Sequence, residues 1–82
     1  MTELMERAYE IRTLIQHNLP PMARVWAPMY SGGVMKFRVK YKTMPIFYAE
    51  LTYNQIMKMP MYEAACFSML HITKQMLERL EE

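Results

Sequence analysis

Apolar and polar residues alternate in the middle of the chain and recur with a helical period toward both ends. From Val34 to Lys42 every second residue is cationic and most of the others are apolar or aromatic, as expected for a strand with one buried and one exposed face. The segments MARVWAPM at 22–29 and TMPIFYAELT at 43–52 are predicted as two further strands, each with a proline that favours an edge position or a strand end. A turn at Gly32 and Gly33 joins the first two strands.

The two ends of the chain have helical patterns. Apolar residues at helical spacing predict one helix at about residues 3–17, and the LPP sequence at 19–21 cannot continue it. The TYNQ sequence at 52–55 matches a capping box and predicts a short turn at about 53–58. A long helix then runs to about residue 80, with Pro60 in its first turn.

These elements predict an α+β fold of order α-β-β-β-α, with a three-stranded antiparallel sheet. We expect residues 1–82 to form a single domain in which both helices cover the same face of the sheet. Phe37 and Val39 then point into the core, whereas Arg38 and Lys40 point outward on an uncovered face.

Composition narrows the class of protein. The 82 residues include one cysteine, two glycines, two histidines and no aspartate. We therefore expect no disulfide framework, no glycine-rich phosphate loop, no metal site, no cofactor and no enzymatic activity. No apolar run approaches the ~18 residues of a membrane span, and the N-terminus lacks a secretion pattern. These features favour an intracellular, cytoplasmic protein.

Charge is spread unevenly along the chain. Residues 22–58 hold six cationic residues and one glutamate, a balance of +5, whereas both ends are net acidic. A cationic sheet face with neighbouring aromatic rings could bind phosphates and stack bases. The same charges could receive an acidic protein surface, or could only keep a solvated strand from aggregating. The candidate residues of this face are Arg24, Trp26, Lys36, Arg38, Lys40, Lys42 and Tyr48.

The last third of the chain holds a second candidate contact patch, formed by Met57, Met59, Phe67 and His71. Methionine suits adaptable binding surfaces, although filling a small core is the alternative role. Cys66 is expected to be buried as a small hydrophobic residue. It is five residues from His71, which on a helix sets the two on different sides and excludes a metal pair or a nucleophile–base pair.

Besides the element order α-β-β-β-α, three local features stand out: NLPPMARVW, SGGVMKFRVKY and the Ala64–Ala65 pair in the last helix. Together these features, which cover about residues 3–80, resemble the double-stranded-RNA-binding domain. The resemblance implies the same fold. The lysine cluster with which such domains hold RNA at the start of the last helix is replaced here by MPMYEAAC, and the histidine of the turn before the second strand is missing. The RNA-binding residues are therefore not carried over.

The sequence supports two hypotheses of function. The first is a small non-enzymatic module that binds nucleic acid, RNA ahead of DNA, through the cationic face. The second is a protein-interaction module, either a dimerisation domain that forms a homodimer or a small inhibitor of the viral or phage type that blocks a larger, acidic or nucleic-acid-handling partner. Relatives of the resembled domain that lack the lysine cluster are similar to such protein-pairing modules.

Overall fold

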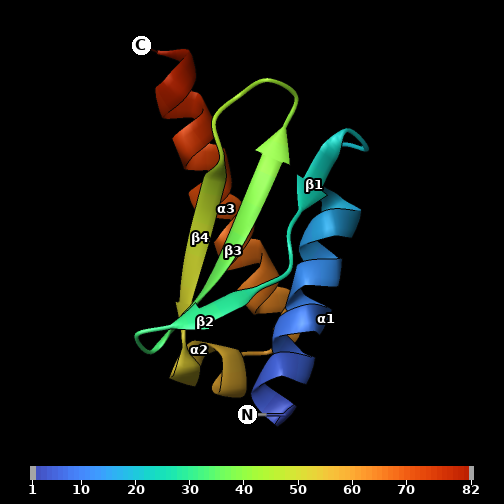
Figure 1. The fold of residues 1–82 in the computed structure, drawn as a ribbon, viewed down its shortest axis with the longest axis vertical. Helices are drawn as coiled ribbons and strands as arrows, with labels where there is room; N and C mark the ends of the chain where they lie inside the picture. The colour runs from blue at the N-terminus through green and yellow to red at the C-terminus, as the bar shows by residue number, and fades with distance from the viewer. Residues whose placement is uncertain (1, 82) are drawn as a thin grey trace.

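The computed structural model describes residues 2–81, which form an antiparallel sheet with helices at both ends of the chain (Figure 1). This confirms the predicted α+β class. In chain order the elements are α1 (Thr2–Asn18), β1 (Ala23–Val25), β2 (Met29–Ser31), β3 (Val34–Tyr41), β4 (Phe47–Thr52), α2 (Tyr53–Lys58) and α3 (Met61–Leu80).

The sheet has four strands, not the three predicted, because the first expected strand is interrupted. β1 and β2 both pair with β3, and β4 pairs with β3 on its other side. Val25 lies opposite Val39, and Met29 lies opposite Lys36. Three residues, 26–28, therefore lie between these pairs on one side and two, 37–38, on the other, so a β-bulge falls at 27–28. Pro28 lacks the N–H needed to continue the ladder there.

A two-residue turn joins β2 to β3. Gly32 and Gly33 both have positive φ, 60° and 82°, which glycine adopts without a steric penalty. Ser31 and Val34, on either side of the turn, are paired across the ladder. The turn therefore sets the register of β2 against β3.

The segment after β4 forms a short helix, α2, where we predicted only a turn. Its capping box is present: the Gln55 N–H donates to Oγ1 of Thr52 at 3.2 Å, and the Thr52 N–H donates to Oε1 of Gln55 at 2.8 Å. Pro60 is the N-cap residue of α3, where its missing N–H costs nothing. The chain can thus turn between two helices within a few residues.

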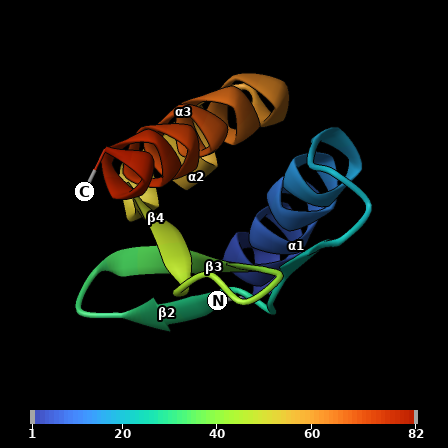
Figure 2. The same ribbon diagram turned by 90° about the horizontal axis from the view of Figure 1, so that it is seen from above.

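Both long helices lie on the same side of the sheet (Figure 2), as predicted. α1 and α3 pack on one another, α1 also on β1 and α3 on β4. Between the layers lies one cluster of buried side chains, with Phe37 and Val39 fully buried among them. The helices contribute Leu4, Ala8, Ile11, Ile15, Ile56, Ala64, Ala65 and Ile72 to this core, and the strands contribute Ala23, Val25, Met35, Phe37, Val39, Phe47, Ala49 and Leu51.

Glutamine side chains from the two long helices hydrogen-bond to the outer strands of the sheet. At β1, Nε2 of Gln16 donates to the Ala23 carbonyl and Oε1 accepts from the Val25 N–H, both at 2.9 Å. At β4, Oε1 of Gln75 accepts from the Tyr48 N–H at 3.1 Å while Nε2 donates to the Tyr48 carbonyl. Each amide group thus pairs with a strand edge much as a neighbouring strand would.

Two arginines of α1 complete the attachment of this helix. The Arg12 guanidinium donates twice to the Val25 carbonyl, at 2.7 and 3.0 Å. The Arg7 guanidinium donates to the carbonyls of Ile56 and Met59, in and just after α2. These bonds satisfy carbonyl groups that have no partner within the helix.

Among residues 2–81, no helix has the length and apolar character needed to cross a membrane.

Candidate functional site

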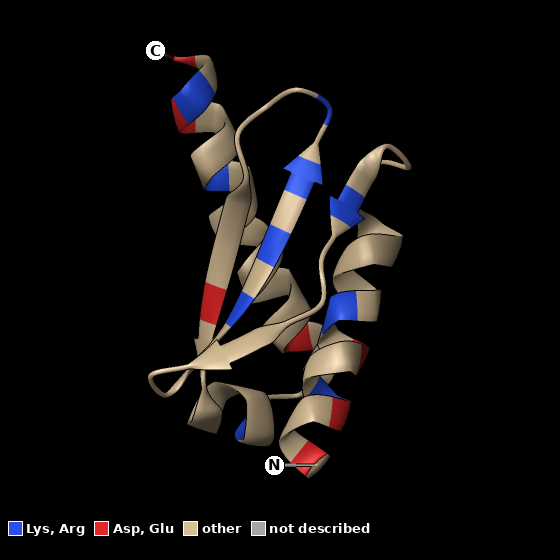
Figure 3. Cartoon of the chain, in the orientation of Figure 1, with Lys and Arg blue, Asp and Glu red and all other residues tan. Residues whose placement is uncertain are grey.

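The uncovered face of the sheet collects the cationic residues predicted for it. Alternation along β3 turns Lys36, Arg38 and Lys40 away from the helices, and all three side chains are half-buried, whereas Met35, Phe37 and Val39 between them are fully buried. Cationic bands follow β1 and β3, and acidic bands lie mainly on the helices (Figure 3). The alternation predicted from the sequence therefore gives the correct faces of β3.

One row of three residues crosses the sheet at the middle of this face. The Trp26 N–H donates to the Arg38 carbonyl at 2.9 Å, and Arg38 lies opposite Tyr48 in the ladder. Arg38 therefore stands between two aromatic residues, which are 39% and 43% exposed. We call Trp26, Arg38 and Tyr48 the central row.

Two further rows flank the central row. On one side, Lys40 lies opposite the exposed Arg24. On the other side, Lys36 lies between Met29 and Glu50. This face therefore carries four cations and one carboxylate around two exposed rings.

Two of the four cations of this face lie over its rings. The Cζ atom of Arg38 is 4.9 Å from the centroid of the Trp26 ring, and Nζ of Lys36 is 4.7 Å from that of Tyr48. Cation–π contacts at exposed sites contribute about 0.5–1 kcal/mol each. They are strong enough to order these side chains and weak enough for a ligand to displace them.

Arg38 also has an unsatisfied donor. Its Nε atom is buried and has no hydrogen-bond partner among the described residues 2–81. A buried donor without an acceptor costs about 1–3 kcal/mol. The centre of the face thus holds a guanidinium whose hydrogen-bonding capacity is incompletely used.

Lys40 and Lys42 are arranged differently from Lys36 and Arg38. Nζ of Lys40 donates to the Met44 carbonyl at 2.6 Å, so its ammonium group is turned to the loop after β3. Lys42 was predicted to continue the outward series, but β3 ends at Tyr41 and Lys42 has a positive φ of 53°. Strand alternation ends there, and Nζ of Lys42 lies 5.3 Å from the Tyr41 ring.

The second predicted patch lies in the helical part of the chain, away from the open face. Met57 and Met59 are half-buried against the core, in and just after α2, which fits the filling role. Phe67 and His71 are on α3, with ring centroids 4.6 Å apart. The structure does not bring these four residues into the central row or its flanks.

The prediction that Cys66 is buried is wrong, because its side chain is exposed. The side of α3 that faces the core carries Ala64, Ala65, Ser68 and Ile72. Ser68 is accommodated there because its hydroxyl donates to the Ala64 carbonyl at 3.0 Å. Apolar residues occupy more of the circumference of this helix than the sheet and α1 cover.

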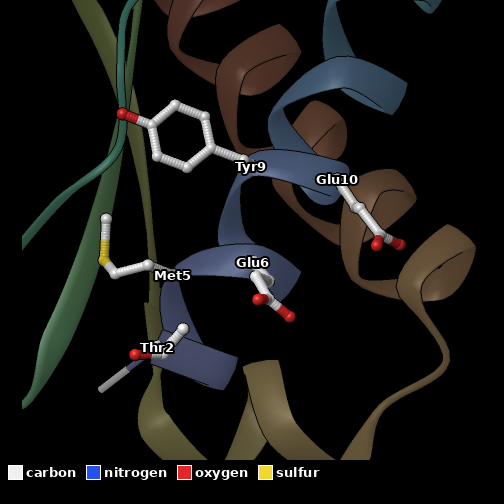
Figure 4. Close-up of a pocket in the computed structure, with 5 residues that line it drawn as sticks. All are labelled: Thr2, Met5, Glu6, Tyr9 and Glu10. Atoms are coloured by element: carbon white, nitrogen blue, oxygen red, sulfur yellow. The ribbon is translucent and has the colours of Figure 1, made fainter.

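A hollow along α1 is lined by residues of that helix alone (Figure 4). Figure 4 shows Met5 and Tyr9 pointing toward the strands, and Glu6 and Glu10 pointing away from them. Thr2 completes the lining. In the described part of the chain, no group of three or more His, Cys, Asp or Glu residues is placed to hold a metal ion.

The chain matches no protein-family model, and no curated protein or solved structure matches it either. Its function is therefore argued from the open sheet face itself.

Proposed function

We propose that the chain is a non-enzymatic binding module whose open sheet face binds single-stranded nucleic acid, with RNA preferred to DNA as the first ligand to test. The observation that carries this proposal is the central row, in which two exposed aromatic rings stand on either side of a guanidinium. Stacking on aromatic rings and neutralisation of phosphates are the two interactions that single strands need from a protein.

The spacing of the central row suits a single strand. Neighbouring strands lie about 4.8 Å apart, so the backbones at Trp26 and Tyr48, on either side of β3, are about 10 Å apart. This leaves room for one base on each ring, with the intervening backbone over Arg38. A duplex keeps its bases stacked on one another, and rings on a flat sheet cannot reach them.

The free protein keeps its cations on the rings that the bases would occupy. A base that stacks on Trp26 takes the place of the Arg38 guanidinium, and a base on Tyr48 takes the place of the Lys36 ammonium group. The displaced cations then become available to phosphate oxygens, and the unsatisfied Nε of Arg38 gains a potential acceptor. Binding therefore replaces weak cation–π contacts within the protein with charged contacts to phosphate.

The direct test is fluorescence anisotropy with labelled single-stranded RNA, single-stranded DNA and duplex RNA of the same mixed sequence, at two salt concentrations. We expect both single strands to bind more tightly than the duplex. The logarithm of the binding constant should fall linearly with the logarithm of the salt concentration. Each phosphate contact should steepen this slope by up to about one unit. Absence of binding to any single strand at low salt would overturn the proposal.

Matched variants separate the face from general effects. Tyr48→Ala removes a ring from the central row, and Tyr53→Ala removes a similarly exposed tyrosine from α2. The joint change Arg38→Glu and Lys40→Glu has its control in Lys58→Glu and Lys74→Glu, on α2 and α3. Only the variants of the face should weaken binding. An equal loss of affinity in the control with Lys58→Glu and Lys74→Glu would show that the net charge of the protein alone drives binding.

An acidic protein surface is the competing ligand, because it would use the same cations without the rings. In that case single strands do not bind. The charge reversals at Arg38 and Lys40 would slow association with the partner, while Tyr48→Ala would have little effect. If none of these variants changes the binding of nucleic acid or of an acidic protein, the cations serve only to keep the strand soluble.

A further inference from the structure

The last helix has a second apolar side that faces away from the sheet. Leu70, Leu77 and Leu80 are 70%, 56% and 74% exposed. Single exposed apolar residues are ordinary, whereas several on one side of one helix indicate an interaction surface. Thr73 and Cys66, which lie between or beside these leucines along the helix, are exposed as well.

These five residues follow the spacing of a coiled coil. The intervals from Cys66 through Leu70, Thr73, Leu77 and Leu80 are four, three, four and three, an average of 3.5 residues. At ~100° for each residue, this line lies roughly 140° around α3 from the side that packs on the core. We call these five residues the leucine seam.

We propose that the leucine seam pairs with the seam of a second copy of this chain, with the two α3 helices parallel, to form a homodimer. A two-fold interface uses the same patch on both copies, so the patch must be complementary to itself. In a parallel pair each leucine meets the same leucine of the second copy. Cys66 and Thr73 then form small layers between or beside the leucine layers.

The residues beside the seam favour the parallel arrangement. In heptad terms the flanking positions hold Met69 and Met76 on one side and Phe67, Lys74 and Glu81 on the other. A parallel pair sets each methionine beside a charged residue of the second copy, so no like charges meet at these flanking positions. An antiparallel pair that keeps all three leucines in the interface sets Lys74 next to Lys74 of the second copy, which is repulsive.

The position of α3 leaves the seam accessible. Its C-terminal turns extend past the ends of the strands in Figure 1, and the sheet lies on the other side of the helix. The seam spans only about four turns, so it buries less than the ~800 Å² for each partner of a standard interface. The dimer should therefore form with a micromolar or weaker dissociation constant.

The open sheet face takes no part in this interface, so the two proposals are independent. Loss of dimerisation leaves single-strand binding by one copy intact, and loss of the central row leaves the dimer intact. Failure of one can thus be distinguished from failure of the other.

Sedimentation equilibrium of the full chain over a wide concentration range tests the pairing. We expect a reversible transition from the monomer mass to twice that mass. Leu70→Lys with Leu77→Lys should abolish it while preserving the fold by circular dichroism, because both positions are exposed and lysine is a good helix former. The control adds two lysines elsewhere, with Met22→Lys and Tyr53→Lys at exposed positions off α3, and should dimerise normally.

Cys66 provides a readout of the orientation. In a parallel pair the two Cys66 side chains share a layer, so a short bismaleimide should link the copies rapidly in the native protein and far more slowly in the lysine variant of the seam. A monomer at every concentration, a larger assembly, a dimer that survives the lysine variant, or cross-linking at an equal rate in that variant would each overturn the proposal.

Discussion

The two faces of the central strand carry residues that alternate in sequence but are stabilised in different ways. On the inner face, Met35, Phe37 and Val39 have no exposure to water. On the outer face, Lys36 and Arg38 rest on aromatic rings. Inner side chains gain their free energy from burial and close packing. Outer side chains gain little free energy from their contacts, and their charged groups stay accessible at the surface.

This difference indicates where each face should respond to mutation. Changes on the inner face should appear in the free energy of unfolding, and changes on the outer face in binding. A strand of eight residues can thereby support the core and present a ligand surface at once, because successive side chains point to opposite faces of the sheet.

The largest expected effect is on stability at the inner face. Phe37→Ala should lower the free energy of unfolding by about 3–5 kcal/mol, because it leaves a cavity between sheet and helices. Arg38→Ala, one residue away, should lower it by less than about 1 kcal/mol, because it loses a cation–π contact and also removes the unsatisfied Nε donor. Urea denaturation of both variants measures the contrast. Similar losses of unfolding free energy in the two variants would mean that stability does not depend mainly on the inner face.

The next effect is on binding at the outer face. Trp26→Ala should weaken single-strand affinity by about 1–3 kcal/mol if its ring stacks on a base. Anisotropy titrations measure this, with the unfolding midpoint of the same variant recorded alongside. A loss of affinity that only parallels a loss of stability would argue against a stacking role for this ring.

A smaller effect is expected at the sheet edges, which belong to neither face. Gln75→Ala removes two hydrogen bonds to Tyr48 and should cost about 1 kcal/mol, because water replaces part of them. Hydrogen exchange of the Tyr48 amide should quicken, while that of the Val25 amide, held by Gln16, should not change locally. Equal acceleration at both amides would show that the two edges open together.

The smallest effect is expected at Cys66. Because its side chain is exposed, Cys66→Ala should change the free energy of unfolding of the monomer by less than about 0.5 kcal/mol. Rapid alkylation of the native thiol by a maleimide at low protein concentration provides the accompanying measurement. Protection from alkylation under those conditions would contradict the exposure seen in the structure.

Much of the fold was predictable because its signals are local. The alternation in 34–41 identified the faces of β3, and helical spacing placed α1 to within one residue at each end. The break between β1 and β2 was not predicted. Pro28 signalled an irregularity, but a one-residue shift in register appears only once both strands are paired with β3.

The error on α3 and the unpredicted hydrogen bonds at the sheet edges have a tertiary cause. An apolar stripe wider than the surface available to cover it does not reveal which part is buried, and so Cys66 was misplaced. Gln16 and Gln75 look like ordinary exposed helix residues in the sequence. Their partners are backbone groups 7 to 27 residues away, which no periodicity marks. The central row was predicted only as a set of candidates, and its binding role stays a prediction.

The glutamine amides that cover β1 and β4 also affect how the molecule behaves in a crowded solution. Exposed strand backbone is a template onto which another chain can add, and repeated addition produces fibrils. Here the backbone groups at Ala23, Val25 and Tyr48 are already occupied, and β2 is three residues long and directly follows Pro28. Growth by strand addition is therefore disfavoured, and this native-state protection should weaken wherever a helix separates from the sheet.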